Sequence, residues 1–457
     1  MEEVVILNEQ PICNESSIGC DVHSNNVVCC SLKKAADGTW IQTREVFDTN
    51  YRTLHRFAEW CQRFDPQVIV MESTGTYWMS PYVALEKAGL PITIVNPAQV
   101  KGMAGHKTDQ EDAHWLAQIG VNGSYKRSFI PEKRYRDLRM VNRNITKLRN
   151  QVSSCKNRET KIFVTAGYRL GVFSNEFGKL AEMAKDAILE GKSPEEIVAT
   201  ILSDKASKHL KATRQELLEA LHGEMTQSLQ LVIESIRRIR RNLEEEIRIN
   251  TEYLLSEVRR SDEKGFNLLQ TIPGIDELAA AIIIVELGGQ SKFLESFKNS
   301  DKFAGWAGLC PGHNQSNKKT TGKKGRHGDK YLRSILCESA NAAVRTKGTT
   351  FQSKYQSLVI RLRYKKAVFA IAHKIARVIY SVLSHNRPYI DPHVDYKAEA
   401  CKKNKARWLK QLVACDDIEI TATNKATGEV YSSQIYQEAM RALRAGAVRN
   451  AGRQRSA

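Results

Sequence analysis

The sequence lacks the features of a secreted, zinc-bound or membrane-spanning chain. None of its ten cysteines forms a C-x-x-C pair, so a structural zinc site is not expected. The acidic N-terminus, MEEVVILNEQ, has neither the basic start nor the apolar core of a signal peptide. The longest apolar run, Leu278 to Val285, is far too short to span a bilayer. We therefore expect a cytoplasmic protein with reduced thiols and no membrane partner.

Acidic residues are scarce relative to basic ones. The 457 residues include 51 Asp and Glu against 69 Lys and Arg, which gives a formal net charge of +18. Charge of this size favours polyanionic partners, such as nucleic acid, and makes association salt-dependent. The alternative is a basic protein with no nucleic-acid role. The length allows roughly two to four domains.

Residues 15–160 are expected to form a ribonuclease-H-like α/β domain that ends in a basic helix. Three strands, a helix, a strand, a helix and a strand follow one another, which is the element order of that fold class. The predicted strands are 17–21, 27–32, 40–47, 68–71 and 92–95, and the predicted helices are about 51–63, 81–88 and 109–120.

Four carboxylates stand at positions where chemistry is expected. Asp21 ends the first strand, and Glu72 follows the buried strand VIVM. Asp109 and Asp112 are three residues apart, so both project from one face of a helix. Four acids brought together repel one another unless cations neutralise them. Such oxygen ligands suit Mg²⁺ or Mn²⁺, although each acid taken singly is more often a cap or a surface charge.

A strongly basic helix is predicted after this sheet. Between Lys126 and Lys161 there are twelve Lys and Arg against three acids, while apolar residues recur at helical spacing. The charges are therefore expected on the outer face, where they either are simply solvated or bind phosphates. The residues assigned to nucleic-acid binding here are Lys126, Arg127, Arg134, Arg136, Arg139 and Arg143.

The rest of the chain is expected to be mostly helical. Residues 161–261 predict a helical linker with a long helix or coiled-coil arm, which serves either dimerisation or packing along its own domain. A mostly helical C-terminal domain is expected over 262–385, followed by a basic extension over 386–457. That extension includes a predicted hairpin around residues 425–428.

A second basic cluster lies within the C-terminal domain. Residues 318 to 333 hold seven basic residues against one acid, with three glycines. Ser316, Thr320 and Thr321 offer hydroxyls in this field, and a hydroxyl among cations suits attack on a DNA phosphate. The alternative is a flexible loop that only grips the DNA backbone. The basic residues assigned to binding are Lys318, Lys319, Lys323, Lys324, Arg326, Lys330 and Arg333.

Several motifs resemble the DEDD transposases of bacterial insertion sequences, a group described as bridge-RNA-guided serine recombinases. The resemblance covers about residues 17–160 and 262–385. The motifs that carry it are IGCDVHS (18–24), VMESTGTYW (70–78), VNPAQVKGMAGHKTDQEDAHWLA (95–117), TIPGI (271–275), FAGWAGLCP (303–311) and GRHGDKYLRSIL (325–336).

The resemblance implies a DNA transposase or recombinase with a Holliday-junction-resolvase-like domain. Asp21, Glu72, Asp109 and Asp112 would be its metal-binding carboxylates, with Mg²⁺ or Mn²⁺ as cofactor. Ser316, five residues after Pro311, matches the family's nucleophilic serine, although this chain has Gln315-Ser316-Asn317-Lys318 where the family has a patch rich in serine and glycine. The implied partners are donor and target DNA, a noncoding bridge RNA and further copies of the chain in a dimer or tetramer. The implied location is the bacterial nucleoid.

Three other hypotheses fit parts of the pattern. A metal-dependent junction nuclease would use the carboxylates to activate water. A nucleic-acid-binding scaffold would carry a degenerate domain, and this hypothesis predicts that Asp21→Asn changes only affinity. A sugar-kinase-like fold also opens with a strand and an acidic turn, but the sequence has no second phosphate-binding glycine motif.

Overall fold

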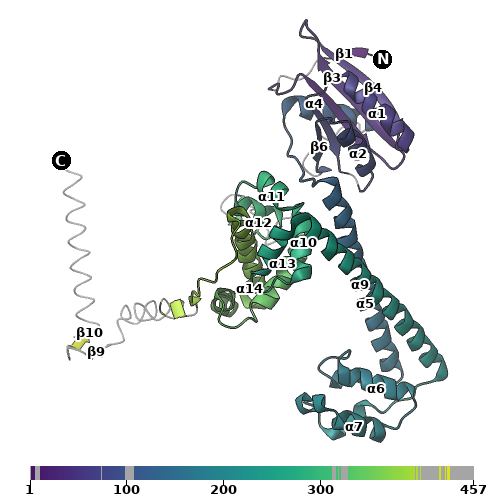
Figure 1. Ribbon diagram of the computed structural model, residues 1–457, viewed down its shortest axis with the longest axis vertical. Coiled ribbons are helices and arrows are strands. Elements are labelled where there is room, and N and C mark those ends of the chain that lie inside the picture. Colours follow the sequence, from purple (N-terminus) through teal and green to yellow (C-terminus); the bar gives the residue numbers. More distant parts are fainter. Residues whose placement is uncertain are drawn as a thin grey trace. The chain divides into compact units, whose positions relative to one another are not determined.

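The computed structural model describes two compact units, Met1–Pro131 and Glu132–Ala457. The described residues are 2–5, 11–73, 75–97, 108–310, 315–316, 319–320 and 328–396, with short pieces between 398 and 432. The elements of both units are labelled in Figure 1.

The first unit is built on a mixed six-stranded sheet. Its order is β1-β4-β3-β2-β5-β6; β1, β4, β3 and β2 pair antiparallel, whereas β2, β5 and β6 run parallel. The five strands in the order β4-β3-β2-β5-β6 have the arrangement and polarity of the ribonuclease-H-like fold. That part of the prediction is confirmed. The strands are β1 (Glu2–Val5), β2 (Ser16–Val22), β3 (Asn26–Lys34), β4 (Trp40–Asp48), β5 (Val68–Glu72) and β6 (Ile92–Val95).

Helices cover both faces of this sheet because side chains alternate along each strand. Cys29 of β3 packs in the core under α1 (Tyr51–Arg63) and α2 (Met79–Lys87), whereas its neighbour Cys30 packs beneath α4 (Asp109–Asn122) on the other face. The eight cysteines that the structure describes are all free. Burial raises the pKa of the Cys29 thiol, so it acts as a hydrophobic side chain.

In the second unit, α5 (Lys133–Thr165) and α9 (Gln227–Gln270) pack against each other as a long pair. The pair carries a small helical module at one end, which we call the arm-end module (Figure 1). The module has its own apolar core, which includes Phe163 and Ile201. Its elements are η1 (Leu170–Val172), α6 (Lys179–Leu189), α7 (Pro194–Ser203), η2 (Lys205–His209) and α8 (Arg214–Ala220).

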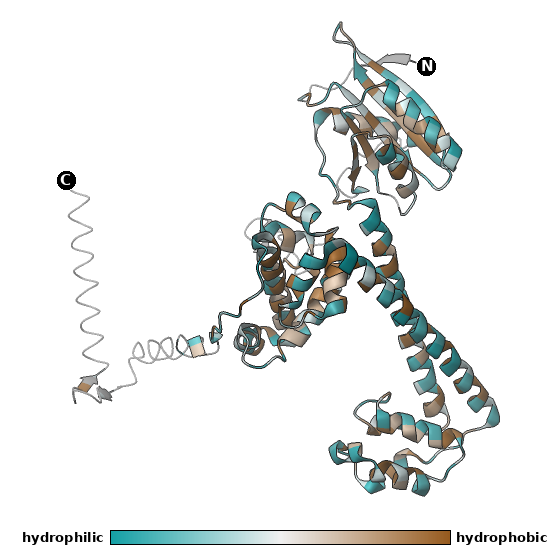
Figure 2. Cartoon of the chain, in the orientation of Figure 1, coloured by the Kyte–Doolittle hydropathy of each residue, from teal (hydrophilic) through white to brown (hydrophobic). Residues whose placement is uncertain are grey.

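The C-terminal helices form the body of the second unit. Apolar residues are buried in its interior, as they are in the sheet of the first unit, and Figure 2 shows how hydrophobic and hydrophilic residues are distributed along its helices. The central helix, α10, is buried along almost its whole length because nearly every residue in it is apolar. The helices are α10 (Glu277–Leu287), α11 (Gln290–Ser296), α12 (Ser300–Trp306), α13 (Lys330–Ala343) and α14 (Thr350–His385).

Among the described residues, one helix is long and apolar enough to cross a membrane by length and composition alone. This helix is α14, and half of its most apolar window is buried inside the protein. Arg363 has non-helical backbone angles and interrupts it. Since α14 packs along α12 and α13, we assign it to the core of the helical body.

Two expected boundaries differ from the observed units. The basic helix α5 was expected with the N-terminal domain up to residue 160, but it pairs with α9 in the second unit. Helix α9 runs on to Gln270, with non-helical angles at Asp262, where the C-terminal domain was expected to begin. The predicted hairpin near residues 425–428 is present as β9 (Thr421–Thr423) paired with β10 (Val430–Ser432).

Candidate active site

The first two predicted carboxylates stand side by side at one edge of the sheet. Strands β2 and β5 are parallel, with Cys20 opposite Met71, so the next residues in register are Asp21 and Glu72. Neighbouring parallel strands in register point these side chains to the same face of the sheet. Asp21 is only 8% exposed and Glu72 is half-buried. The strand register therefore brings together two acids that are 51 positions apart in the sequence.

The other two carboxylates are carried by the first turn of α4. Thr108 caps this helix, with its hydroxyl accepting a hydrogen bond from the Glu111 backbone N–H at 3.3 Å. Asp109 is exposed and Asp112 is half-buried. Acidic residues are favourable in this first turn because the unpaired N–H groups leave partial positive charge there.

Gly19 lets α4 lie directly on β2. A Cβ atom at position 19 would stand 2.1 Å from the Ala113 carbonyl oxygen and 2.3 Å from the Ala117 backbone nitrogen. Only glycine fits this contact, because its backbone has no side chain to separate the helix from the strand. Since Gly19 lies two residues before Asp21, the same contact brings the start of α4 towards the strand end.

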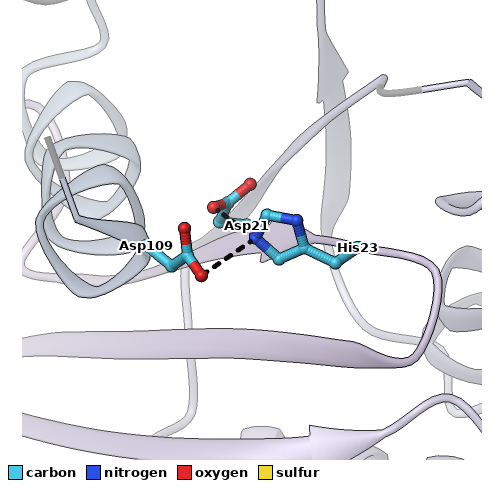
Figure 3. A group of neighbouring side chains, drawn as sticks. All are labelled: Asp21, His23 and Asp109. Carbon is cyan, nitrogen blue, oxygen red and sulfur yellow. Dashed lines mark hydrogen bonds and ion pairs between the residues drawn. The ribbon is translucent and has the colours of Figure 1, made fainter.

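A histidine that was not singled out from the sequence completes this cluster. His23 Nε2 lies 3.1 Å from Asp21 Oδ2 and 3.4 Å from Asp109 Oδ2. Figure 3 shows the imidazole between the two carboxylates. One donor atom from each of the three side chains lies within 4.8 Å of the others, a spacing that could hold a metal ion. The available signal was the Asp21-Val22-His23 spacing, because residues two apart along a strand share a face.

The electrostatics of the cluster depend on the buried carboxyl of Asp21. Burial raises its pKa, and the nearby charges of Asp112, Glu72 and Asp109 raise it further, whereas His23 lowers it. The other three predicted carboxylates therefore lie close enough to Asp21 to raise its pKa. Repulsion of this kind is relieved when a cation binds between the acids.

The donor set fits a hard divalent cation. Asp21, Glu72, Asp109 and Asp112 supply carboxylate oxygens from two strand ends and one helix turn, and oxygen is the donor atom that Mg²⁺ and Mn²⁺ prefer. Neutralising the repulsion around Asp21 is the physical reason for a cation there. These four residues would hold the cation, which would stabilise negative charge on a phosphoryl group.

Ser316 lies in the second unit, within a short hairpin. Its backbone belongs to β7 (Gln315–Ser316), which pairs antiparallel with β8 (Lys319–Thr320) so that Ser316 is opposite Lys319. Thr320 is also in β8, and the remaining candidate hydroxyl, Thr321, lies outside the described residues.

The segment that contains this hairpin leaves and re-enters the helical body at almost the same place. A Cβ atom at Gly328 would lie 2.3 Å from the Gly308 backbone nitrogen. The Asp329 N–H donates to the Trp306 carbonyl at 3.3 Å. The Asp329 side chain then caps α13 by accepting from the Tyr331 and Leu332 N–H groups, each at 2.9 Å. The ends of the segment are therefore fixed.

The predicted basic residues have different surroundings. Lys126, Arg127, Arg134 and Lys330 are exposed, whereas Arg136, Arg143 and Arg333 are half-buried. Arg134 also pairs with Glu257, at 3.4 Å. Lys318, Lys323, Lys324 and Arg326 lie outside the described residues, and Lys319 is described by its backbone in β8.

Arg139 does not lie on the surface, which corrects its assignment to nucleic-acid binding. It is only 9% exposed. Its guanidinium is 3.1 Å from the buried Glu286 carboxylate and donates to the Val285 and Glu286 carbonyls. A buried charge needs a partner inside the protein, so Arg139 joins α5 to α10. The helical spacing of the apolar residues could not reveal an acid facing α5 from another helix.

Two family models match most of the region that the motifs cover. A model described as "Transposase" matches residues 18–166, and a model described as "Transposase IS116/IS110/IS902 family" matches residues 266–356. Together the two matches cover just over half of the chain. The chain belongs to the IS116/IS110/IS902 family of transposases. It is therefore a DNA-modifying enzyme.

Curated relatives of this family match over most of their length. A "Probable family 20 transposase" of Pseudomonas aeruginosa is 24% identical over 81% of this chain and 94% of its own. A "Pilin gene-inverting protein" of Moraxella bovis is 22% identical over 82% of this chain and 98% of its own. The solved structure of Thermus thermophilus RuvC aligns with 25% of this chain and 99% of its own, at 18% identity and a TM-score of 0.21. The ribonuclease-H-like fold assigned above rests on the strand order.

Proposed function

We propose that this transposase cuts and rejoins DNA strands through a covalent serine–DNA intermediate, with Ser316 as the nucleophile. The observation that carries the proposal is the register of β2 and β5, which puts Asp21 beside Glu72 at the strand ends, with Asp109 and Asp112 on the first turn of the helix that packs on β2. The relatives named as a transposase and as a gene-inverting protein support DNA rearrangement as the outcome.

In the proposed step, the Ser316 oxygen attacks the phosphorus of a DNA phosphodiester. A phosphorus–oxygen bond to serine forms and the bond between phosphorus and the 3′ oxygen breaks. The serine hydroxyl loses its proton, and the released 3′ oxygen gains one to become a 3′ hydroxyl. The new ester keeps the energy of the broken bond, so a second 3′ hydroxyl can attack it and rejoin a strand without ATP.

In this proposal, some residues stabilise charge during the reaction and others hold the reacting groups in position. Asp21, Glu72, Asp109 and Asp112 would hold a divalent cation, which would stabilise the negative charge that develops on the phosphoryl and leaving oxygens. Gly19 and the strand register hold the four acids in place. The seven basic residues between positions 318 and 333 support a cationic surrounding for the attacking hydroxyl.

The proposal includes a noncoding RNA and an oligomer. The resemblance to bridge-RNA-guided recombinases supports an RNA that pairs with donor and target DNA, while the protein grips backbones in the bacterial nucleoid. The oligomer is supported by α9, which exposes Leu231, Val232, Ile239, Ile249 and Tyr253. These side chains form a second apolar stripe, roughly a third of a turn from the face that packs on α5.

A denaturing gel tests the covalent step. The purified protein is incubated with Mg²⁺, the RNA of its element and labelled donor and target DNA. We expect a protein–DNA adduct from the wild type that disappears in Ser316→Ala and in Asp21→Asn. Thr320→Ala serves as the matched control, since it removes a hydroxyl from the same hairpin and should retain the adduct.

The alternative outcomes separate the rival hypotheses. Cleavage that survives Ser316→Ala without any adduct would identify a nuclease that uses water. If Thr320→Ala loses the adduct and Ser316→Ala retains it, the nucleophile would be Thr320 and not Ser316. An adduct that forms equally without RNA would remove the RNA from the proposal and leave the serine chemistry standing.

A further inference from the structure

Helix α14 is broken at one point, and the break is strained. Arg363 has φ 61° and ψ 170°, a region that glycine alone occupies without strain. The Tyr364 hydroxyl donates to Asn341 Oδ1 on α13 at 2.6 Å, which holds the broken segment against the body. We call residues 360–366 the α14 tip. Strained backbone of this kind often marks a functional site.

The α14 tip carries uncompensated positive charge. Arg361, Arg363, Lys365 and Lys366 are all exposed. The sequence has no acid between Glu338 and Asp391, although it has ten Lys and Arg there. In the part of the chain that the structure describes, none of these four cations has an ion pair. Four like charges within six residues repel one another unless an anion lies beside them.

An apolar side chain projects from the same place. Ile360 is 86% exposed, the highest value among the large hydrophobic side chains that the structure describes. Burying an exposed isoleucine lowers the free energy by removing its apolar surface from water. Contact with a partner would therefore be favourable at this position. Proteins that bend DNA use isoleucine and similar residues as wedges between base steps, beside cations that hold the phosphates.

From these observations we propose that the α14 tip is a DNA-binding site, in which the four cations bind backbone phosphates and Ile360 inserts between bases. This inference rests on the proposed function for its choice of DNA as the polyanion. The tip lies outside the basic clusters at residues 126–161 and 318–333. It therefore adds a third place at which the protein holds its substrate.

Charge decides between DNA and other occupants of the tip. A second copy of the chain also has a net charge of +18, so the repulsion would persist if two copies met there. Insertion into a lipid bilayer would require the following half of α14, but Ala367, Ile371 and Ile375 of that half are buried in the helical body. Double-stranded DNA supplies closely spaced phosphates together with an apolar stack of bases.

Salt-dependent binding tests the phosphate contacts. Full-length Arg361→Gln/Lys365→Gln/Lys366→Gln protein is compared with the wild type by fluorescence anisotropy, using a labelled duplex and a labelled four-way junction. Each phosphate contact contributes about 0.9 to the slope of log affinity against log salt concentration. We expect the slope to fall by about two to three. The matched control, Lys205→Gln/Lys208→Gln/Lys211→Gln, removes three exposed cations from the arm-end module and should keep the wild-type slope.

A second variant isolates the wedge. Ile360→Ala keeps every charge, so its salt slope should equal that of the wild type. DNA with 2-aminopurine beside the bound step reports unstacking as a rise in fluorescence, and we expect that rise with the wild type but not with Ile360→Ala. A wild-type rise in both proteins would overturn the wedge.

Other outcomes would overturn the site itself. The inference fails if the triple variant keeps the wild-type slope, if its slope falls only with an RNA hairpin, or if its main change is in the oligomer mass measured by light scattering. The Ser316→Ala variant should bind with the full slope. If the wild type forms the covalent adduct and the tip variants bind DNA normally, the α14 tip is not a DNA-binding site, but the serine mechanism stands. The opposite pattern would refute the serine mechanism and leave the tip standing.

Discussion

His23 Nε2 lies between Oδ2 of Asp21 and Oδ2 of Asp109, at 3.1 and 3.4 Å. The imidazole therefore links two acids that come from different elements of the fold. One ligand atom from each of these three side chains lies within 4.8 Å of the others, so together they could hold a metal ion. The cluster is therefore prepared for a cation by the protein's own residues.

Divalent cations should stabilise the first unit through this cluster. A ligand that binds only the folded state at about a hundred times its Kd stabilises by about 2.7 kcal/mol. We expect Mg²⁺ or Mn²⁺ to raise the Tm of the wild type but not of Asp21→Asn, measured by calorimetry. Glu111→Gln is the matched control, since Glu111 is an exposed acid on the same turn of α4. An equal response from both variants would mean that the cation binds elsewhere.

Gly19→Ala should weaken cation binding without touching a carboxylate. The new methyl group would overlap the backbone of Ala113 and Ala117, so α4 must move away from β2. We expect the free energy of unfolding to fall by about 1–3 kcal/mol and the Mn²⁺ affinity, measured by titration calorimetry, to fall with it. Gly89→Ala is the control: it has φ +71° but open space around it, so it should cost stability and leave the affinity unchanged.

Arg139→Ala should be strongly destabilising above about pH 7, where Glu286 is ionised, because it removes the guanidinium that lies 3.1 Å from this buried carboxylate. Breaking such a pair costs about 3–5 kcal/mol, which chemical denaturation would measure. Lys133→Ala on the same helix removes only an exposed pair with Asp137 and should cost less than about 1 kcal/mol. The double variant Arg139→Met/Glu286→Leu should recover most of the loss. A small effect of Arg139→Ala would show that the pair does not join α5 to α10.

Glu286 should make stability depend on pH. Burial raises its pKa from 4.5 to about 7, and Asp329 adds to the rise, whereas Arg139, Asn142 and Arg143 oppose it. Below pH 4.5 the carboxyl is protonated in both states. As the pH rises towards 7 the unfolded chain ionises first, so stability is lost through this window, by on the order of 3 kcal/mol.

The comparison with Glu286→Gln isolates this contribution. We subtract the free energy of unfolding of Glu286→Gln from that of the wild type. This difference should fall as the pH rises from 4.5 to 7.5, because only the wild type loses stability through residue 286. A difference that stays constant or grows over that range would mean that Arg139 keeps Glu286 ionised in the folded state.

The exposed apolar stripe of α9 should control oligomer size. Ile239→Lys together with Ile249→Lys adds charge to the stripe, and sedimentation should then show a smaller species than the wild type. Replacing the exposed Arg238 and Arg241 by alanine on the same helix should leave the mass unchanged. The same mass for Ile239→Lys/Ile249→Lys and the wild type would exclude this stripe as the contact between copies.

The strands of the sheet could be predicted closely because buried strands appear in the sequence as short apolar runs. The runs around Ile18, Val70 and Ile94 are short and apolar, and turn residues separate them, so strand positions were correct to within a residue or two. Strand β1 was missed because Glu2–Val5 is a short edge strand with no alternating pattern.

The positions of Asp21 and Glu72 followed from the same signal, since both stand at strand ends. Contacts between distant elements could not be predicted in this way. Arg139 looked like a surface charge because its partner, Glu286, lies on another helix and itself looked like a single acid in an apolar run. His23 was overlooked because a histidine near a strand end gains meaning only when Asp109 is brought beside it. The break in α14 could not be predicted, because the sequence around Arg363 contains no glycine or proline and continues the helical pattern.

The arm-end module has a core of its own and is connected along the chain to α5 at one end and to α9 at the other. At the junction, buried Glu159 of α5 pairs with Arg237 and Arg240 of α9 and with Lys185 of the module's own α6, so these ion pairs tie the two helices to each other and to the module. The chain thus enters and leaves this module through adjacent, fixed points. A module that replaces residues 170–226 must therefore cover Phe163 and Ile233, which the arm-end core buries, and must supply a cation beside Glu159 in place of Lys185.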